Sequence, residues 1–131
     1  MHPYQSRLYL TDEKIAMEIV IISNNPDVWK TYPDALHVDG DPCDVLRTAR
    51  DLVHQGGELF SHPFHGNMRL LRNPFRSMIL KSDKGEIDSD SVLSIEESLS
   101  RLDSVTFDTR QESRDDYQYI DKDLLEKSFP I

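Results

Sequence analysis

The sequence contains a single cysteine, few glycines and no long apolar run, and each of these shortages excludes a class of protein. Cys43 cannot form a disulfide within the chain, and a zinc ribbon would need more than one cysteine. The five glycines do not form the phosphate-binding loop of a nucleotide-binding protein. The longest aliphatic run is residues 19–22, whereas a membrane-spanning helix needs about 20 apolar residues. We therefore expect a soluble protein.

Positive charge is also scarce in this chain. It has 15 Lys and Arg residues against 24 Asp and Glu residues, a formal net charge of −9. Because nucleic acids and anionic membranes attract proteins through basic groups that displace phosphate counterions, we expect neither as a partner. Residues 1–10 have neither the basic start nor the apolar stretch of a signal peptide, so the predicted location is the cytoplasm.

Short β-branched or apolar segments alternate with helical patterns along the 131 residues, a length that suits one domain. Strands are predicted at residues 18–23, 35–38, 58–61 and 75–81, and helices directly after Asn25, at residues 42–55 and at residues 88–104. Such alternation is typical of an α/β fold. We predict a single small α/β domain with a mainly parallel sheet of about four strands and helices on its faces.

The two ends of the chain differ from its middle. Residues 1–17 are mixed in character, and the residues after 105 are polar and acidic. We therefore divide the chain into an N-terminal extension (1–17), a core α/β domain (18–105) and an acidic C-terminal extension (106–131). Apolar residues at 117–120 and 124–129 predict a short strand followed by a terminal helix.

Three polar clusters follow the first three predicted strands. Their members are Ser23, Asn24 and Asn25; Asp39 and Gly40; and Ser61, His62 and His65. Because ligands of open parallel sheets collect at the carboxyl ends of the strands, we expect the clusters to converge on one rim as a ligand site. Asn and Asp at these positions also suit helix N-caps, so capping alone is the alternative for the first two clusters.

The third cluster places two histidines three positions apart in a loop with Pro63 and Gly66. Imidazole titrates near neutrality, so these side chains suit contact with a substrate or an anion, and His62 suits general acid–base catalysis. Surface or turn-stabilising histidines are the alternative. A metal site usually needs a third or fourth ligand, and the sequence offers no convincing one, so we predict neither a metal nor a cofactor.

A basic strip lies inside this acidic chain. Residues 59–82 contain no Asp or Glu but do contain Arg69, Arg72, Arg76 and Lys81. Since the planar guanidinium of arginine suits carboxylate and phosphate groups, we predict a small anionic metabolite as the ligand, with Arg72 or Arg76 near it. The alternative is that these side chains pair with the acidic residues 83–90 or with the C-terminal tail.

The chain contains an ordered series of short motifs, at residues 21–26 (IISNNP), 38–40 (VDG), 44–46 (DVL), 50–56 (RDLVHQG), 61–63 (SHP), 74–77 (PFRS) and 95–98 (IEES). This series resembles the GrdX family, small proteins named for their association with glycine reductase operons. The resemblance extends over residues 18–104 and implies a small α/β cytoplasmic protein, without supplying a cofactor or a reaction. The family pattern typically continues after His-Pro with Leu-Ser-Gly, where this chain has Phe64, His65 and Gly66, so the resemblance favours His62 over His65.

Three functions are compatible with these observations. The preferred hypothesis is an accessory or regulatory protein of the GrdX type, which binds a small anionic ligand or a protein partner at the strand ends. The second is an enzyme acting on an anionic metabolite, with His62 as general acid or base and Asn24, Asn25 and Arg76 orienting the substrate. The third is a purely structural protein that forms a homodimer through a helical face.

Overall fold

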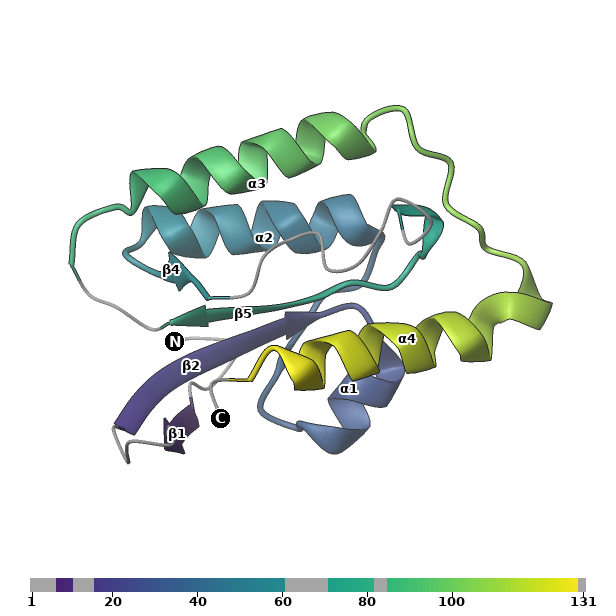
Figure 1. The fold of residues 1–131 in the computed structure, drawn as a ribbon, viewed down its shortest axis with the longest axis horizontal. Coiled ribbons are helices and arrows are strands. Elements are labelled where there is room, and N and C mark those ends of the chain that lie inside the picture. The colour runs from purple at the N-terminus through teal and green to yellow at the C-terminus, as the bar shows by residue number, and fades with distance from the viewer. Residues whose placement is uncertain (1–6, 11–15, 61–70, 82–84, 130–131) are drawn as a thin grey trace.

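The computed structural model describes residues 7–10, 16–60, 71–81 and 85–129, which form three layers (Figure 1). A five-stranded sheet is covered on one face by α2 (Pro42–His54) and α3 (Ser89–Leu102), and on the other by α1 (Pro26–Thr31) and α4 (Arg114–Lys127). The strands are β1 (Arg7–Leu10), β2 (Ala16–Ser23), β3 (Leu36–His37), β4 (Glu58–Leu59) and β5 (Ser77–Lys81). The prediction of a single small α/β domain is confirmed.

Local capping chemistry explains where the first two helices begin. Asn25 caps α1, because its side-chain oxygen accepts a hydrogen bond from the backbone N–H of Asp27 at 3.0 Å. Asp41 and Asp44 form a reciprocal capping box at the start of α2, with N–O distances of 2.9 and 3.0 Å. Gly56 follows the end of α2 with a φ of 107°, a conformation that glycine adopts without strain.

The sheet is mixed, so the prediction of a mainly parallel sheet is wrong. Its order is β1-β2-β5-β4, with β3 beside the carboxyl end of β2. Of the ladders in the described part of the chain, only β2–β3 is parallel, and β1–β2, β2–β5 and β5–β4 are antiparallel. A parallel neighbour requires a crossover, usually a helix, and the sequence between β4 and β5 has no helical periodicity.

The first three predicted strands nevertheless run in the same direction. β5 is antiparallel to both β2 and β4, so β4 runs parallel to β2 on the far side of β5. β3 is parallel to β2 by direct pairing. The carboxyl ends of β2, β3 and β4 therefore point toward the same rim, although β5 separates β4 from the other two.

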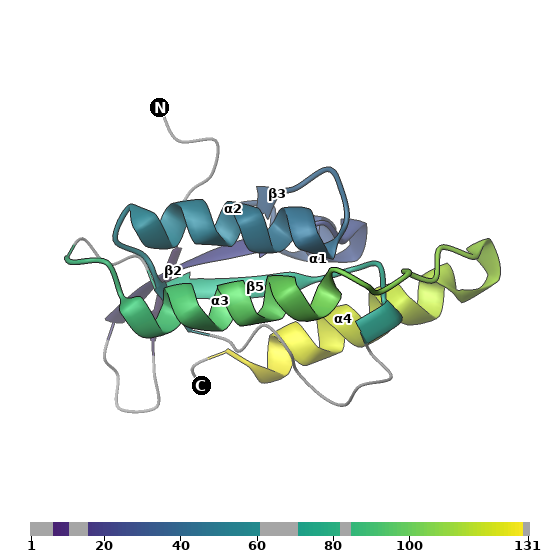
Figure 2. The ribbon, with the colours of Figure 1, turned by 90° about the horizontal axis from the view of Figure 1, so that it is seen from above.

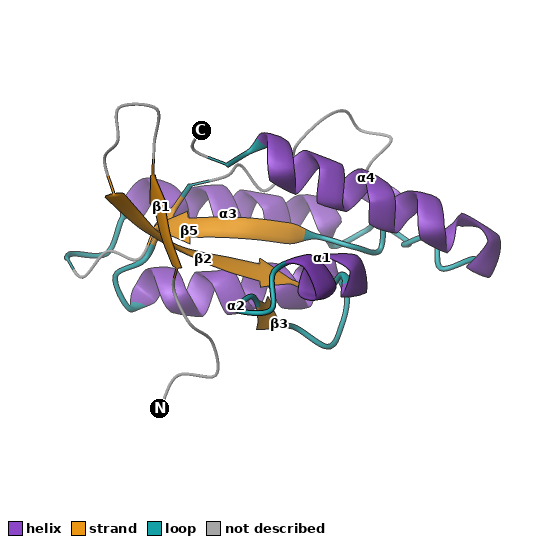
Figure 3. Ribbon diagram, turned by 90° about the horizontal axis from the view of Figure 1, so that it is seen from below, coloured by secondary structure: helices purple, strands orange, loops and turns teal. Residues whose placement is uncertain are grey.

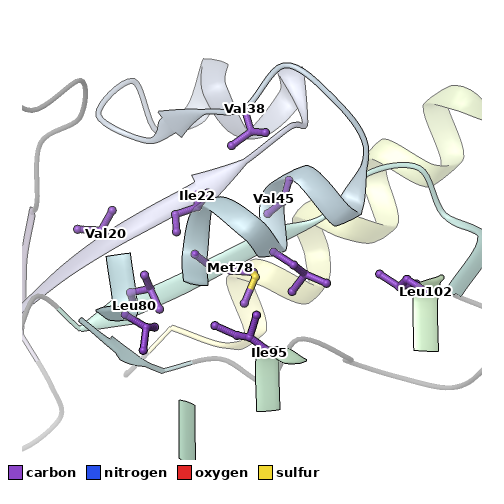
Figure 4. Packing of buried hydrophobic residues seen from close by; sticks show 11 residues of the cluster. Val20, Ile22, Val38, Val45, Met78, Leu80, Ile95 and Leu102 are labelled. Atoms are coloured by element: carbon purple, nitrogen blue, oxygen red, sulfur yellow. The ribbon is translucent and has the colours of Figure 1, made fainter. Parts of the chain in front are cut away.

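The core occupies both faces of the sheet. Val20 and Ile22 of β2 pack with residues of α2 and α3, including Val45 and Ile95 (Figure 4). The neighbouring residues of β2, such as Ile21, belong to the other cluster, together with residues of α1 and α4. Because both faces are covered, residues 19–22 of β2 are all apolar rather than alternating, as the sequence indicated. Helices α2 and α3 lie side by side over the first face (Figure 2).

The C-terminal segment forms one continuous helix, so the predicted short strand at residues 117–120 is wrong. Gln118, Asp121 and Leu125 are the buried residues of α4, and their spacing of three and four positions is that of one helix face. Leu125 joins the core cluster that contains Val28 of α1, and α4 lies beside α1 on the same face of the sheet (Figure 3). The division of the chain into a domain and two extensions stays a prediction.

Candidate functional site

A pocket of about 400 Å³ opens at the carboxyl ends of β2 and β3. Four segments of the chain line it. Its lining residues are Asn24, Pro26 and Trp29; Val38, Asp39, Gly40 and Asp41; Pro74 and Phe75; and Phe107, Asp108, Thr109, Arg110 and Arg114. The volume lies in the range that is typical of small-molecule sites, roughly 300 to 1,000 Å³.

Asn24 ties two of these segments together. Its side-chain nitrogen donates to the carbonyl oxygens of Gly40 and Pro74 at 2.9 and 2.8 Å, and its side-chain oxygen accepts from the backbone N–H of Arg76 at 2.7 Å. Asn24 is 6% exposed. The amide therefore holds the β3–α2 loop and the loop before β5 at a fixed separation.

The β3–α2 loop requires glycine at position 40. A β-carbon at Gly40 would collide with the side chain of Asp44. That carboxylate accepts a hydrogen bond from the backbone N–H of Asp41 in the capping box, so moving it away would break this bond. Asp39 and Asp41 on either side of Gly40 are exposed, and both residues line the pocket.

Aromatic side chains supply the apolar part of the lining. The indole of Trp29 stacks on the imidazole of His37 with ring centroids 4.4 Å apart, and its N–H donates to the carbonyl oxygen of Ser23 at 2.8 Å. The guanidinium of Arg114 lies 5.0 Å from the centroid of the Phe75 ring. These contacts fix the orientation of Trp29 and place a cation beside an apolar wall.

The other wall of the pocket is built around Asp108. Its carboxylate accepts two hydrogen bonds from the side chain of Arg110, from Nε and Nη2, both at 2.8 Å, and a third from the hydroxyl of Tyr117 at 2.9 Å. The bonds from Arg110 hold the pKa of Asp108 well below its usual range, and Asp108 in turn raises the pKa of Arg110. The Asp108 side chain is 3% exposed whereas that of Arg110 is 65% exposed, so the carboxylate anchors a guanidinium that faces solvent.

A buried polar network lies beneath the rim and joins α4 to the sheet. The hydroxyl of Ser77 donates to Asp121 Oδ2 at 2.7 Å, and the side-chain amide of Asn25 donates to the same oxygen at 3.0 Å. The hydroxyl of Ser23 lies 2.7 Å from that of Ser77. Burial raises the pKa of Asp121, although these hydrogen bonds and the charge of Arg76 act in the opposite direction.

A family model for GrdX-like proteins matches residues 20–130. The chain belongs to the GrdX-like protein family. The matched region includes every segment that lines the pocket and the whole of α4. No similarity was found to a curated protein or to a solved structure.

The structure of this GrdX-like protein separates the predicted site residues into groups. Asn24, Asp39 and Gly40 line the pocket, whereas Ser23 and Asn25 belong to the buried network beneath it. Ser61, His62 and His65 lie outside the described residues.

Neither of the two predicted arginines is among the lining residues of the pocket. Arg76 is buried beside a cavity of about 20 Å³ that Asp121 also lines, and burial lowers the pKa of its guanidinium. Arg72 is exposed, and its Nε donates to the carbonyl oxygen of Thr106 at 3.3 Å. Arg72 therefore supports the backbone of the Asp108 wall.

Sequence reasoning missed the wall formed by residues 107–114. Phe107, Asp108, Arg110 and Arg114 come from the segment that was predicted to be an extension. The segment has no helical or strand periodicity before residue 111, so no local pattern pointed to it. Its role depends on long-range contacts, such as the hydrogen bond from the backbone N–H of Asp108 to the carbonyl oxygen of Arg72 at 2.8 Å.

The described part of the chain offers little support for metal, membrane or thiolate chemistry. No three His, Cys, Asp or Glu side chains within it are grouped so that they could hold a metal ion. None of its helices is both long enough and apolar enough to cross a bilayer. Burial and the nearby Asp41 raise the pKa of the Cys43 thiol, which keeps the thiol protonated at neutral pH.

Proposed function

We propose that this GrdX-like protein is an accessory or regulatory protein that binds a small anionic metabolite in the rim pocket. The observation that carries the proposal is the presence of two arginines, Arg110 and Arg114, beside aromatic walls in a pocket of about 400 Å³. A concave site of this size favours a small molecule over a protein segment. Binding of a protein partner and formation of a homodimer stay predictions.

The two arginines suit an acidic group in different ways. Arg110 uses Nε and Nη2 on Asp108, so its plane is fixed. Its Nη1 lies 4.0 Å from the exposed carboxylate of Glu112, and the Arg110 side chain remains 65% exposed. Arg114 lies over the ring of Phe75, a position that leaves the N–H groups at the edge of its plane available to a carboxylate or a phosphate. A fixed guanidinium loses little conformational freedom when it binds, which favours affinity.

The polar groups at the base of the pocket favour binding over catalysis. The side chains of Asn24 and Asp108 are engaged in hydrogen bonds that hold the walls in place, and Trp29 is oriented by Ser23 and His37. These residues build a rigid cavity rather than a set of groups that exchange protons with a ligand. The proposal therefore gives the pocket the role of recognising a metabolite.

Titration calorimetry in low salt tests the proposal, with 4-methylbenzoate and phenyl phosphate as probes. We expect saturable binding of at least one probe, because unscreened guanidinium groups attract acidic groups most strongly at low ionic strength. Arg114→Gln should weaken that binding about tenfold, the effect of losing roughly 1.4 kcal/mol of interaction.

Arg50→Gln is the matched control, because Arg50 pairs with Glu96 on the helical face away from the pocket lining. Arg110→Lys, which keeps the charge but not the planar fork, provides a second variant. Absence of binding by both anions, or binding that neither pocket arginine affects, would contradict the proposed function.

A further inference from the structure

Besides Asp108, which is the ion-pair partner of Arg110, two further carboxylates line the pocket. Asp39 and Asp41 line it from the β3–α2 loop, and both are exposed. Asp41 uses one oxygen as the N-cap of α2. Asp39 makes no hydrogen bond or ion pair within the part of the chain that the structure describes, so its charge has no partner there.

The acidic and basic groups of the pocket come from separate segments. Asn24 lies between the β3–α2 loop and the loop before β5, because its amide nitrogen bonds to Gly40 and Pro74. Arg114 lies beyond the latter loop, over the ring of Phe75. The charges that act most strongly on the pKa of Arg110 belong to its own segment. Neither Asp39 nor Asp41 forms an ion pair with Arg110 or Arg114 in the described part of the chain.

This arrangement has a consequence for an anionic ligand. An acidic group bound at Arg110 or Arg114 would share the pocket with the uncompensated charge of Asp39, which repels a purely anionic molecule. A cationic group on the same ligand would turn that repulsion into attraction. Pro26, Trp29, Val38, Phe75 and Phe107 line the same pocket and suit an apolar body.

We propose that the ligand is a zwitterion whose acidic and cationic groups stand at the two ends of an apolar body. The acidic group binds at Arg110 and Arg114, the cationic group binds at Asp39 and Asp41, and the aromatic lining contacts the body. This inference rests on the proposed function, because it names the class of ligand for the same pocket. A single molecule then places a group of opposite charge beside each wall.

Three probes with one carbon skeleton test the inference by calorimetry in low salt. They are 4-(aminomethyl)benzoate, which carries both charges, 4-methylbenzoate, which carries only the acidic group, and 4-methylbenzylamine, which carries only the cation. We expect the zwitterion to bind about tenfold more tightly than either single-charge probe, as one additional favourable charge contact of roughly 1.4 kcal/mol would produce.

Variants assign each end of the ligand to its wall. Asp39→Asn should weaken binding of 4-(aminomethyl)benzoate about tenfold and leave binding of 4-methylbenzoate unchanged or tighter. Arg114→Gln should weaken both. Asp51→Asn is the matched control, since Asp51 is an exposed acid of α2 outside the pocket lining. Thermal unfolding of each variant checks that it is folded.

The outcomes separate this inference from the proposed function. If 4-methylbenzoate binds as tightly as the zwitterion and Asp39→Asn changes neither affinity, the zwitterion is wrong and an anion-binding pocket stands. If 4-methylbenzylamine binds most tightly, or if neither these three probes nor phenyl phosphate binds, both proposals are wrong.

Discussion

Two buried aspartates of the C-terminal segment have pKa values that are shifted in opposite directions, although burial by itself raises the pKa of both. Asp108 stands before α4 and has a pKa well below its usual range, whereas Asp121 lies within α4 and has a raised pKa. Asp108 is held by a guanidinium, and Asp121 is held mainly by the neutral donors of Asn25 and Ser77. A positive partner offsets the free-energy cost of removing a charged carboxylate from water. Neutral hydrogen bonds offset that cost only in part.

The two aspartates have different roles in the C-terminal segment. The Asp121 network fastens α4 to the sheet through groups that are far apart in the sequence, and burial makes these groups costly to leave without partners. The Asp108 cluster places Arg110 at the surface of the pocket. The Asp121 network therefore stabilises the fold, whereas the Asp108 cluster positions the charge of Arg110 at the pocket. The following variants test whether these two roles are separate.

Removing Asn25 should produce the largest loss of stability. Asn25→Ala deletes the N-cap of α1 and the donors to Asp121 and to the carbonyl oxygen of Gln118. Because buried acceptors lose their partners as well, we expect a loss of about 2 to 4 kcal/mol in the free energy of unfolding. Asp41→Ala, which removes an exposed cap, should cost about 1 kcal/mol. Urea denaturation followed by circular dichroism measures both, and equal losses would contradict the role of the network.

Asp121→Asn should change how stability depends on pH. Because folding raises the pKa of Asp121, its contribution is fully present below the unfolded pKa and is lost as the pH rises through the folded pKa. The neutral amide cannot ionise, so the variant should gain stability relative to the wild type as the pH increases. The slope can reach about 1.4 kcal/mol per pH unit, the value for one proton. A difference that is constant between pH 4 and 8 would show that Asp121 is ionised throughout.

Asp108→Asn should show the opposite dependence. Its folded pKa is lowered, so its contribution is present above the unfolded pKa and is lost as the pH falls through the folded value. The variant should be less stable than the wild type at pH 7, and the two should converge on acidification. We expect a smaller effect than at Asp121, because Arg110 is 65% exposed and solvent screens the pair. Urea midpoints between pH 2.5 and 7 measure the convergence, and a gap that widens with acid would contradict the ion pair.

Tyr117→Phe should have the smallest effect. It removes one hydrogen bond to Asp108 and leaves the two from Arg110 in place. We expect a loss of about 1 kcal/mol in the free energy of unfolding, the typical net value of one hydrogen bond. Binding of 4-methylbenzoate should stay within a few-fold of the wild type. A loss of binding as large as that of Arg114→Gln would show that Tyr117 also positions the pocket wall.

The starts of α1 and α2 could be predicted from the sequence because capping is local. Asn25 and Asp41 bond to backbone groups two or three positions away, and a proline follows each of them. The buried strand β2 could be predicted for a similar reason, because an uninterrupted apolar run is typical of a strand that is covered on both faces. The same capping function leaves Asn25 and Asp41 ambiguous as ligand contacts, and the structure confirms that both act as caps.

The sheet order and one wall of the pocket could not be predicted in this way. Whether β5 pairs with β2 or lies at an edge depends on the path of the chain after β4, which local patterns do not encode. Asn24 bonds to residues 16 and 50 positions away, and Asn25 bonds to Asp121 at a separation of 96 positions. The polar residues of the C-terminal segment therefore look like a solvated tail until those contacts are known.

The sequence by itself determined the class of fold, the starts of α1, α2 and α3, the buried strand and the membership of the GrdX-like family, because periodicity, capping and ordered motifs are properties of neighbouring residues. Only the tertiary structure decided that β5 lies between β2 and β4, that Arg110 and Arg114 complete the pocket, and that the pKa values of Asp108 and Asp121 are shifted in opposite directions. Each of these features depends on which residues, distant in the sequence, surround a given side chain. The burial of that side chain and the charges near it then set its pKa.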